Sequence, residues 1–166
     1  ASGIISGSFA LSSALLSVRK AFTSLSDSSA YIRLGNEENV RTFFRSDVPN
    51  ILRPDMKDVN FLFDDSYKGG KRLNIVAHST LDEASGTAQI RNNMVILTGG
   101  QFSRHLGYTR YATYRDYQFA RIVMCDSAAG EENSFAAGFA LASGLPTKGY
   151  IGDVHIRLSL HGIVNQ

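Results

Sequence analysis

Short segments in which apolar and polar residues alternate constrain the fold of this chain more than any other feature. The clearest is residues 153–161, where Val154, Ile156, Leu158 and Leu160 alternate with polar side chains. Alternate side chains of a strand point to opposite faces of a sheet, so this segment predicts a strand with one buried face. From residue 30 on, similar segments are bounded by Gly, Asn and Asp, which is typical of strands joined by turns.

This pattern favours a mainly β chain, folded as an antiparallel sandwich or jelly-roll-like barrel of about six to eight strands with one or two short helices. No Pro- or Ser-rich linker divides residues 30–166, so we expect a single antiparallel β domain there. Gly99 and Gly100 predict a hairpin turn. Residues 108–125 are long enough for two strands or one bent strand, and Gly138 within residues 135–142 favours strand or loop over helix.

Residues 1–29 form a Ser-rich segment of a different character. Some of their apolar residues recur at spacings of three and four, which is typical of a helix, whereas the Ser content favours an extended arm. These apolar residues are Leu11, Ala14, Leu15, Val18, Phe22 and Leu25. Both alternatives stay open, and one short helix of the fold is expected here. Arg19 and Lys20 follow the apolar stretch instead of preceding it, which argues against a signal peptide.

The composition indicates a folded domain that needs no covalent or metal cross-link. The chain has 166 residues, 43% of them hydrophobic and 19% charged, with one Cys and a net charge of +2. A chain of this length buries roughly two-thirds of its unfolded surface, so we expect no disulfide and no cofactor. No apolar run reaches the roughly 18 to 20 residues of a membrane-spanning helix, so we expect no membrane partner.

Two places hold residue types used in nucleophilic catalysis. His78, Ser79 and Asp82 include those of a hydrolytic triad, but adjacent strand residues point to opposite faces, so His78 does not ordinarily receive the Ser79 proton. Cys125 follows the apolar run 122–124 and is interpreted as a buried small side chain, because the sequence places no His beside it. The sequence therefore assigns no catalytic residue and favours a protein that is not an enzyme.

Two groups of side chains are candidate metal ligands. Asp153 and His155 share one strand face roughly 7 Å apart, while His161 lies about 20 Å further along. The second group lacks the spacing and central Gly of a Ca²⁺ loop. It consists of Asp55, Asp58, Asp64 and Asp65. We interpret both groups as solvated polar surface and predict no metal site.

The most unusual stretch, residues 104–121, interleaves arginines with tyrosines. Arg supplies phosphate contacts and aromatic rings stack on unpaired bases, so this composition suits single-stranded nucleic acid. Tyr and Arg are also enriched at protein interfaces, so a subunit contact is favoured over RNA, and ordinary sheet surface is a third alternative. The candidate nucleic-acid or subunit-interface residues are Arg104, Tyr108, Arg110, Tyr111, Tyr114, Arg115, Tyr117 and Arg121.

Three segments of the last third carry a further pattern: residues 117–124, the Gly- and acid-containing loop 126–133, and the terminal strand pattern 152–160. Together they resemble the closing strands of small icosahedral virus coat proteins. Coat proteins of single-stranded RNA phages are also similar in size, in low Cys content and in lacking an Arg-rich tail. The resemblance implies a shell-forming subunit that binds RNA on a sheet surface. The RNA-neutralising arm of plant virus coats and the two C-terminal helices of phage coats are not evident, so no functional residue is transferred.

We therefore expect a self-assembling structural protein, a viral or phage capsid subunit that forms a shell around nucleic acid. Its expected partners are copies of itself and single-stranded RNA, and its expected location is the virion, assembled in the host cytoplasm. The alternative is a β-sandwich module that binds carbohydrate or peptide through Tyr stacking. A hydrolase that uses His78 with Ser79, or Cys125, is the third hypothesis.

Overall fold

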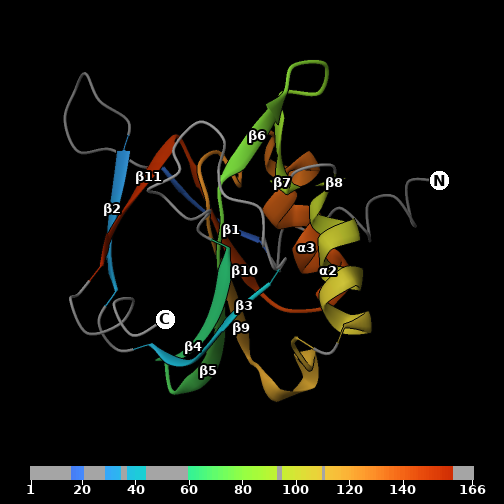
Figure 1. Ribbon diagram of the computed structural model, residues 1–166. Helices are drawn as coiled ribbons and strands as arrows, with labels where there is room; N and C mark the ends of the chain where they lie inside the picture. Colours follow the sequence, from blue (N-terminus) through green and yellow to red (C-terminus); the bar gives the residue numbers. More distant parts are fainter. Residues whose placement is uncertain are drawn as a thin grey trace, which may run out of the picture.

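The computed structural model describes residues 16–20, 29–34, 37–43, 60–92, 95–109 and 111–158. Their strands form three sheets (Figure 1). The largest has six strands in the order β1-β10-β9-β5-β4-β3. These strands are β1 (Leu16–Lys20), β3 (Glu38–Thr42), β4 (Phe61–Tyr67), β5 (Gly70–Val76), β9 (Phe119–Val123) and β10 (Thr147–Ile151).

In the described part of the chain, two smaller sheets and two helices accompany the six-stranded sheet. The three-stranded sheet consists of β6 (Ser79–Asp82), β7 (Thr87–Asn92) and β8 (Val95–Leu97). The two-stranded sheet pairs β11 (Asp153–Leu158) with β2 (Ser29–Leu34). The helices are α2 (Gly99–Tyr108) and α3 (Phe135–Ser143), and single 3₁₀ turns lie at η1 (Tyr114–Asp116) and η2 (Glu131–Asn133).

The mainly β class with two short helices is confirmed, and the pairing of the strands adds a feature that the sequence did not show. The antiparallel expectation holds for β3 with β4, β4 with β5, and the β6-β7-β8 sheet. By contrast, β5 pairs with β9, β9 with β10, and β10 with β1 in parallel. The described residues hold eleven strands, more than the predicted six to eight, because several are only three to five residues long. Strands that short leave little alternation to read.

Long crossovers explain the parallel pairs. The chain passes from β5 to β9 through the small β6-β7-β8 sheet and α2, and from β9 to β10 through α3. Parallel neighbours need connections of this length, since a tight turn reverses the chain. Both faces of such strands are covered, and β5 and β9 each end in two adjacent buried apolar residues, Ile75-Val76 and Ile122-Val123.

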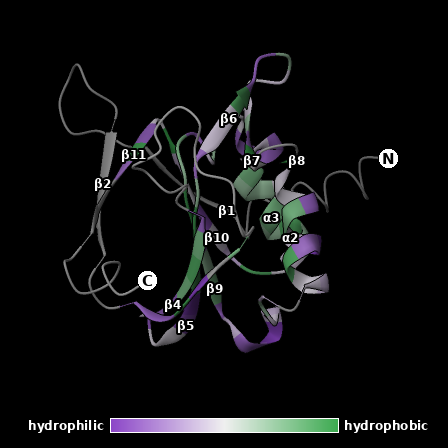
Figure 2. Cartoon of the chain, viewed as in Figure 1, coloured by the Kyte–Doolittle hydropathy of each residue, from purple (hydrophilic) through white to green (hydrophobic). Residues whose placement is uncertain are grey.

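The six-stranded sheet carries a hydrophobic core on each face. On one face, Phe102 of α2 and Phe139 of α3 pack with Leu73, Ile75 and Ile122. The hydrophobic residues of α3 stand out in Figure 2. On the other face, the core consists of Phe61, Phe63, Val76, Val123 and Tyr150. The parallel strands are thus held between two apolar layers, which fixes where their ends lie.

The hairpin turn predicted at Gly99 and Gly100 is wrong, since both residues begin helix α2. Thr98 accepts a hydrogen bond from the Gln101 backbone while the Gln101 side chain accepts one from the Thr98 N–H, a capping box that starts the helix. A Cβ on Gly99 would lie 1.8 Å from the carbonyl oxygen of Phe135. The glycine is therefore required by the close approach of α2 to α3, which outweighs its poor helix propensity.

The preference for strand or loop over residues 135–142 is also wrong, because they belong to α3. Ser134 caps this helix by accepting from the Ala137 N–H, and Gly144 ends it with φ of 74°. Gly138 lies where α3 crosses α2, and a Cβ there would lie 3.2 Å from the Gly100 nitrogen. The glycine that lowered the expected helix content serves helix packing.

Two further segments differ from expectations drawn from the sequence. The described residues of the range 108–125 comprise the end of α2, the turn η1 and one strand, β9. In the N-terminal segment, residues Leu16–Lys20 form β1, which pairs in parallel with β10. A helix through these five residues is therefore wrong. Residues 1–15 and 21–28 lie outside the described part of the chain.

No helix in the described part of the chain combines the length and the apolar character needed to cross a membrane.

Candidate functional site

His78 and Cys125 follow the carboxyl ends of two neighbouring parallel strands. β5 and β9 are in register from Arg72 opposite Phe119 to Val76 opposite Val123. His78 and Cys125 each follow this last pair by two residues. Parallel strands lie about 4.8 Å apart, so the two backbones reach the sheet edge side by side. In open sheets with parallel strands, this is the edge where ligands bind.

Hydrogen bonds keep the two chains together beyond the end of the ladder. The Ala77 N–H donates to the Val123 carbonyl at 3.3 Å. The Ser79 hydroxyl donates to the Cys125 carbonyl at 2.8 Å. His78 stands between these two links, so its backbone is fixed beside the Cys125 turn.

The thiol of Cys125 lies against the backbone of β11. Its Sγ accepts a hydrogen bond from the Val154 N–H at 3.3 Å, and the thiol donates to the Val154 carbonyl at 3.8 Å. The Cys125 residue is partly exposed and His78 is exposed. A nucleophilic thiol needs this kind of access together with a polar neighbour.

The residue after Cys125 has an uncommon backbone conformation. Asp126 has φ of 54°, in the left-handed region that non-Gly residues rarely adopt, although Asp tolerates it better than most. The turn that follows β9 therefore bends sharply at the thiol. Such conformations occur often at functional sites, where the surrounding structure maintains them.

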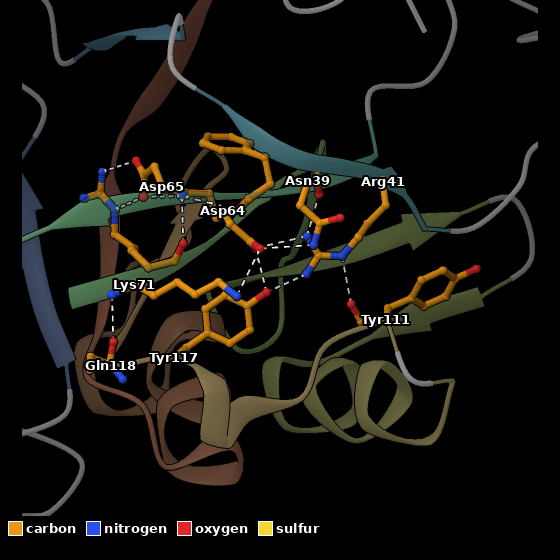
Figure 3. A network of polar contacts seen from close by, with 11 residues as sticks. Asn39, Arg41, Asp64, Asp65, Lys71, Tyr111, Tyr117 and Gln118 are labelled. Atoms are coloured by element: carbon orange, nitrogen blue, oxygen red, sulfur yellow. Dashed lines mark hydrogen bonds and ion pairs between the residues drawn. The ribbon is translucent and has the colours of Figure 1, made fainter.

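A network of buried polar side chains lies at the opposite ends of β5 and β9 (Figure 3). Its centre is Asp64 on β4, whose side chain is 4% exposed. The Tyr117 hydroxyl donates to Asp64 Oδ1 at 2.6 Å, the Arg41 Nη1 lies 3.1 Å from the same atom, and Asn39 donates to Oδ2 at 3.1 Å. Lys71 lies 3.6 Å from Oδ2. These contacts join β3, β4, β5 and the segment before β9.

The network changes the ionisation of its members. Burial opposes the charge of Asp64, but hydrogen bonds from Tyr117 and Asn39 and the charge of Arg41 outweigh it, so the pKa of Asp64 lies below its usual value. Burial, followed by the hydrogen bond to Asp64, raises the pKa of Tyr117 to about 12. Asp64 therefore stays ionised and Tyr117 stays neutral at physiological pH. This arrangement stabilises a fold and leaves no proton transfer near neutral pH.

A second polar group occupies the sheet face that carries Phe63 and Val76. Arg72 donates two hydrogen bonds to Asp65, at 2.9 and 2.6 Å, and Asn74 donates to Asp65 at 2.8 Å. Arg121 donates from Nε to Asn74 Oδ1 at 2.7 Å. Although burial disfavours ionisation of Asp65, the bonds from Arg72 and Asn74 hold its pKa below the usual value. The acidic pair Asp64 and Asp65, interpreted from the sequence as solvated polar surface, is thus held in ion pairs on β4.

The candidate residues of the Arg/Tyr stretch are distributed over several environments. Arg104 and Tyr108 are exposed on α2, with Tyr108 84% exposed, and Arg115 is exposed in η1. Tyr111 and Tyr114 pack against the core beneath the helices, and the Tyr114 hydroxyl donates to the Ser103 carbonyl at 2.6 Å. The remaining described members, Tyr117 and Arg121, belong to the polar networks. Arg110 lies outside the described residues.

A cavity of about 450 Å³ lies at the beginnings of α2 and α3, and Arg104 is its one charged lining residue among those described. Its lining holds no His, Cys, Asp or Glu from the described residues. This cavity is therefore a separate feature from the His78 and Cys125 pair.

Metal binding has no support in the described ranges. They contain no group of three or more His, Cys, Asp or Glu side chains that could hold an ion. Asp153 and His155 lie exposed on β11, and His161 lies beyond the last described residue.

Comparison of the chain with protein-family models, with curated proteins and with solved structures found no match. Function therefore rests on the geometry of the site.

The sequence analysis took His78 and Cys125 separately and did not predict that they follow the ends of neighbouring strands. A signal was present: each residue comes two positions after an apolar β-branched run, Ile75-Val76 for one and Ile122-Val123 for the other. Had both runs been interpreted as buried parallel strands, the common sheet edge would have followed.

Proposed function

We propose that the protein is a thiol-dependent hydrolase or acyl transferase in which Cys125 is the nucleophile and His78 the general base and acid. The observation that carries the proposal is the in-register parallel pairing of β5 with β9, which delivers both residues to one sheet edge. Cys with an adjacent His is an established combination for nucleophilic catalysis.

The reaction follows from the chemistry of the two side chains. His78 takes the thiol proton as the Cys125 sulfur forms a bond to the acyl carbon of an ester, thioester or amide. The tetrahedral intermediate expels its leaving group, which receives the proton from His78. The acyl group remains on Cys125 as a thioester. Water then attacks the thioester carbon and gives a proton to His78. The intermediate breaks the bond between carbon and sulfur and releases the acid, and His78 returns the proton to the sulfur.

The other hydroxyl candidate has a different role in this arrangement. Ser79 donates its hydroxyl hydrogen to the carbonyl of Cys125, a bond that ties the two strand ends together. This bond to a backbone acceptor is short, at 2.8 Å, whereas the thiol of Cys125 lies 3.8 Å from its backbone acceptor, so Ser79 supports the turn while Cys125 offers the nucleophile. This favours Cys125 over Ser79 within the third hypothesis drawn from the sequence.

Covalent trapping with p-nitrophenyl acetate tests the proposal. We expect intact-mass spectrometry to show one acetyl group per chain, mapped to Cys125 and absent in Cys125→Ala. The His78→Gln variant should form the adduct about 10²-fold more slowly, the range for loss of a general base. His105→Gln, which changes a His on α2, is the matched control. Acetylation that persists at the same rate in Cys125→Ala or in His78→Gln would refute the proposal.

A further inference from the structure

Three consecutive side chains at the end of β9 accept hydrogen bonds from three alternate backbone amides. Ser127 Oγ accepts from the Tyr150 N–H at 2.9 Å. Asp126 Oδ1 accepts from the Gly152 N–H at 2.9 Å. Cys125 Sγ accepts from the Val154 N–H at 3.3 Å. The thiol is thus the last member of a series of side-chain acceptors that runs along β10 into β11.

These side-chain acceptors take the place of backbone carbonyls beyond the point where the pairing of β9 with β10 ends. β9 and β10 pair through Thr147 opposite Ala120 and Lys148 opposite Arg121. Beyond the strand, the turn's own N–H groups still donate to β10 and its end, from Ala128 to the Tyr150 carbonyl at 2.8 Å and from Asp126 to the Gly152 carbonyl at 2.9 Å. Buried amides need acceptors, and here side chains supply what carbonyls supply in a regular sheet.

Asp126, the middle residue of this series, both donates a hydrogen bond to Gly152 and accepts one from it. Its backbone N–H donates to Gly152 and its carboxylate accepts from Gly152. Gly152 has φ of 99°, a conformation that requires glycine, and it lies between the end of β10 and the start of β11. The Gly152 position therefore sets where the Val154 N–H lies, two residues further on.

We propose that Asp126 is a positioning residue for the nucleophile: its carboxylate fixes Gly152 so that the Val154 N–H remains on the sulfur of Cys125. The residue acts through Gly152 and Val154 and does not touch substrate. The Val154 N–H thereby holds the sulfur of Cys125 in one orientation. The catalytic meaning of this role rests on the proposed thiol chemistry, whereas the contact itself does not.

Three substitutions separate the carboxylate from the backbone conformation. Asp126→Asn keeps an oxygen acceptor and tolerates positive φ. Asp126→Gly removes the acceptor but adopts positive φ freely. Asp126→Ala removes the acceptor and also strains at positive φ. Asp116→Asn, on the exposed turn η1, is the control for a change of charge alone.

The readouts are the rate of Cys125 alkylation by iodoacetamide as a function of pH and hydrogen exchange of the Val154 amide. We expect Asn to resemble the unsubstituted protein. Gly and Ala should lower the alkylation rate about fivefold, the effect of one lost hydrogen bond, because the Val154 N–H no longer orients the sulfur. Exchange at Val154 should accelerate by a similar factor in both.

Two results would overturn the inference: a Gly variant that matches Asn in both readouts, or an Asn variant as impaired as Gly. If Ala does not fold, the comparison of Asn with Gly is sufficient, since neither is strained. His78→Gln in the same alkylation assay separates the two proposals. An unchanged rate there removes the dyad, while the exchange of Val154 still decides whether Asp126 positions the strand.

Discussion

The contact between α2 and α3 at Gly99 makes a sharp prediction about stability. A Cβ at this position would lie 1.8 Å from the Phe135 oxygen and 2.8 Å from both the Phe135 carbonyl carbon and the Phe139 nitrogen. All three are backbone atoms, so no side-chain rotation relieves the overlap. Because real Cβ contacts essentially never fall below 3.0 Å, the Phe135 oxygen must move by at least 1.2 Å relative to Gly99.

The neighbouring glycine gives a matched control. A Cβ on Gly100 would lie 3.6 Å from the Arg104 guanidinium and 3.9 Å from the Gly138 oxygen, which is ordinary contact. Gly100→Ala should therefore stabilise the protein by about 0.5 kcal/mol through the lower entropy of the unfolded chain. Gly99→Ala should destabilise it by about 3 kcal/mol, the upper part of the range for overpacking, because Phe102 and Phe139 lose contacts as the helices separate.

Urea denaturation monitored by circular dichroism measures both effects. With a slope of about 2 kcal/mol per molar urea, Gly99→Ala should lower the midpoint by about 1.5 M while Gly100→Ala leaves it equal or slightly higher. Equal midpoints for the two variants would refute the close packing of α2 on α3.

Three further predictions concern the polar network, the Arg/Tyr stretch and assembly. Asp64→Asn should lower the free energy of unfolding by about 3 kcal/mol at pH 7, the effect of breaking a buried ion pair. Since the folded pKa of Asp64 is depressed, its stabilisation is present above about pH 4 and lost as pH falls through the folded pKa, so the difference should shrink there in acid titration. Tyr117→Phe should cost about 2 kcal/mol through its lost bonds to Asp64 and Arg41, whereas exposed Tyr108→Phe should change stability by under about 0.5 kcal/mol; equal denaturation midpoints would contradict this. The coat-subunit hypothesis predicts closed particles in negative-stain images and a high-mass peak in size-exclusion chromatography; a monomer at high concentration would count against it.

Local sequence pattern was enough for the mainly β class and for β11, where Val154 alternates with polar neighbours. It was not enough where a contact between distant segments decides the structure. Gly99 and Gly138 look like helix breakers along the chain, and only the approach of two helices explains them. Likewise, parallel pairing arises from crossovers whose partners are separated by about fifty residues, as Val76 and Val123 are.

The candidate site illustrates the same limit. His78 and Cys125 are both residue types of nucleophilic catalysis, yet the sequence pattern predicts a buried Cys125 because no His lies near it along the chain. The register of β5 with β9 supplies that neighbour. In the Arg/Tyr stretch, the sequence suggests a common surface that the structure divides. Tyr117 donates to the buried carboxylate of Asp64, and Arg121 donates to the buried amide of Asn74.

The most direct test of the dyad is the rate at which iodoacetamide alkylates Cys125 in the folded protein at pH 7. We expect His78→Gln to lower this rate by about tenfold or more relative to both the unsubstituted chain and His105→Gln, with the same rate for all three after unfolding in urea. A His78→Gln variant that is alkylated as fast as the unsubstituted folded protein would contradict the proposal that His78 activates Cys125.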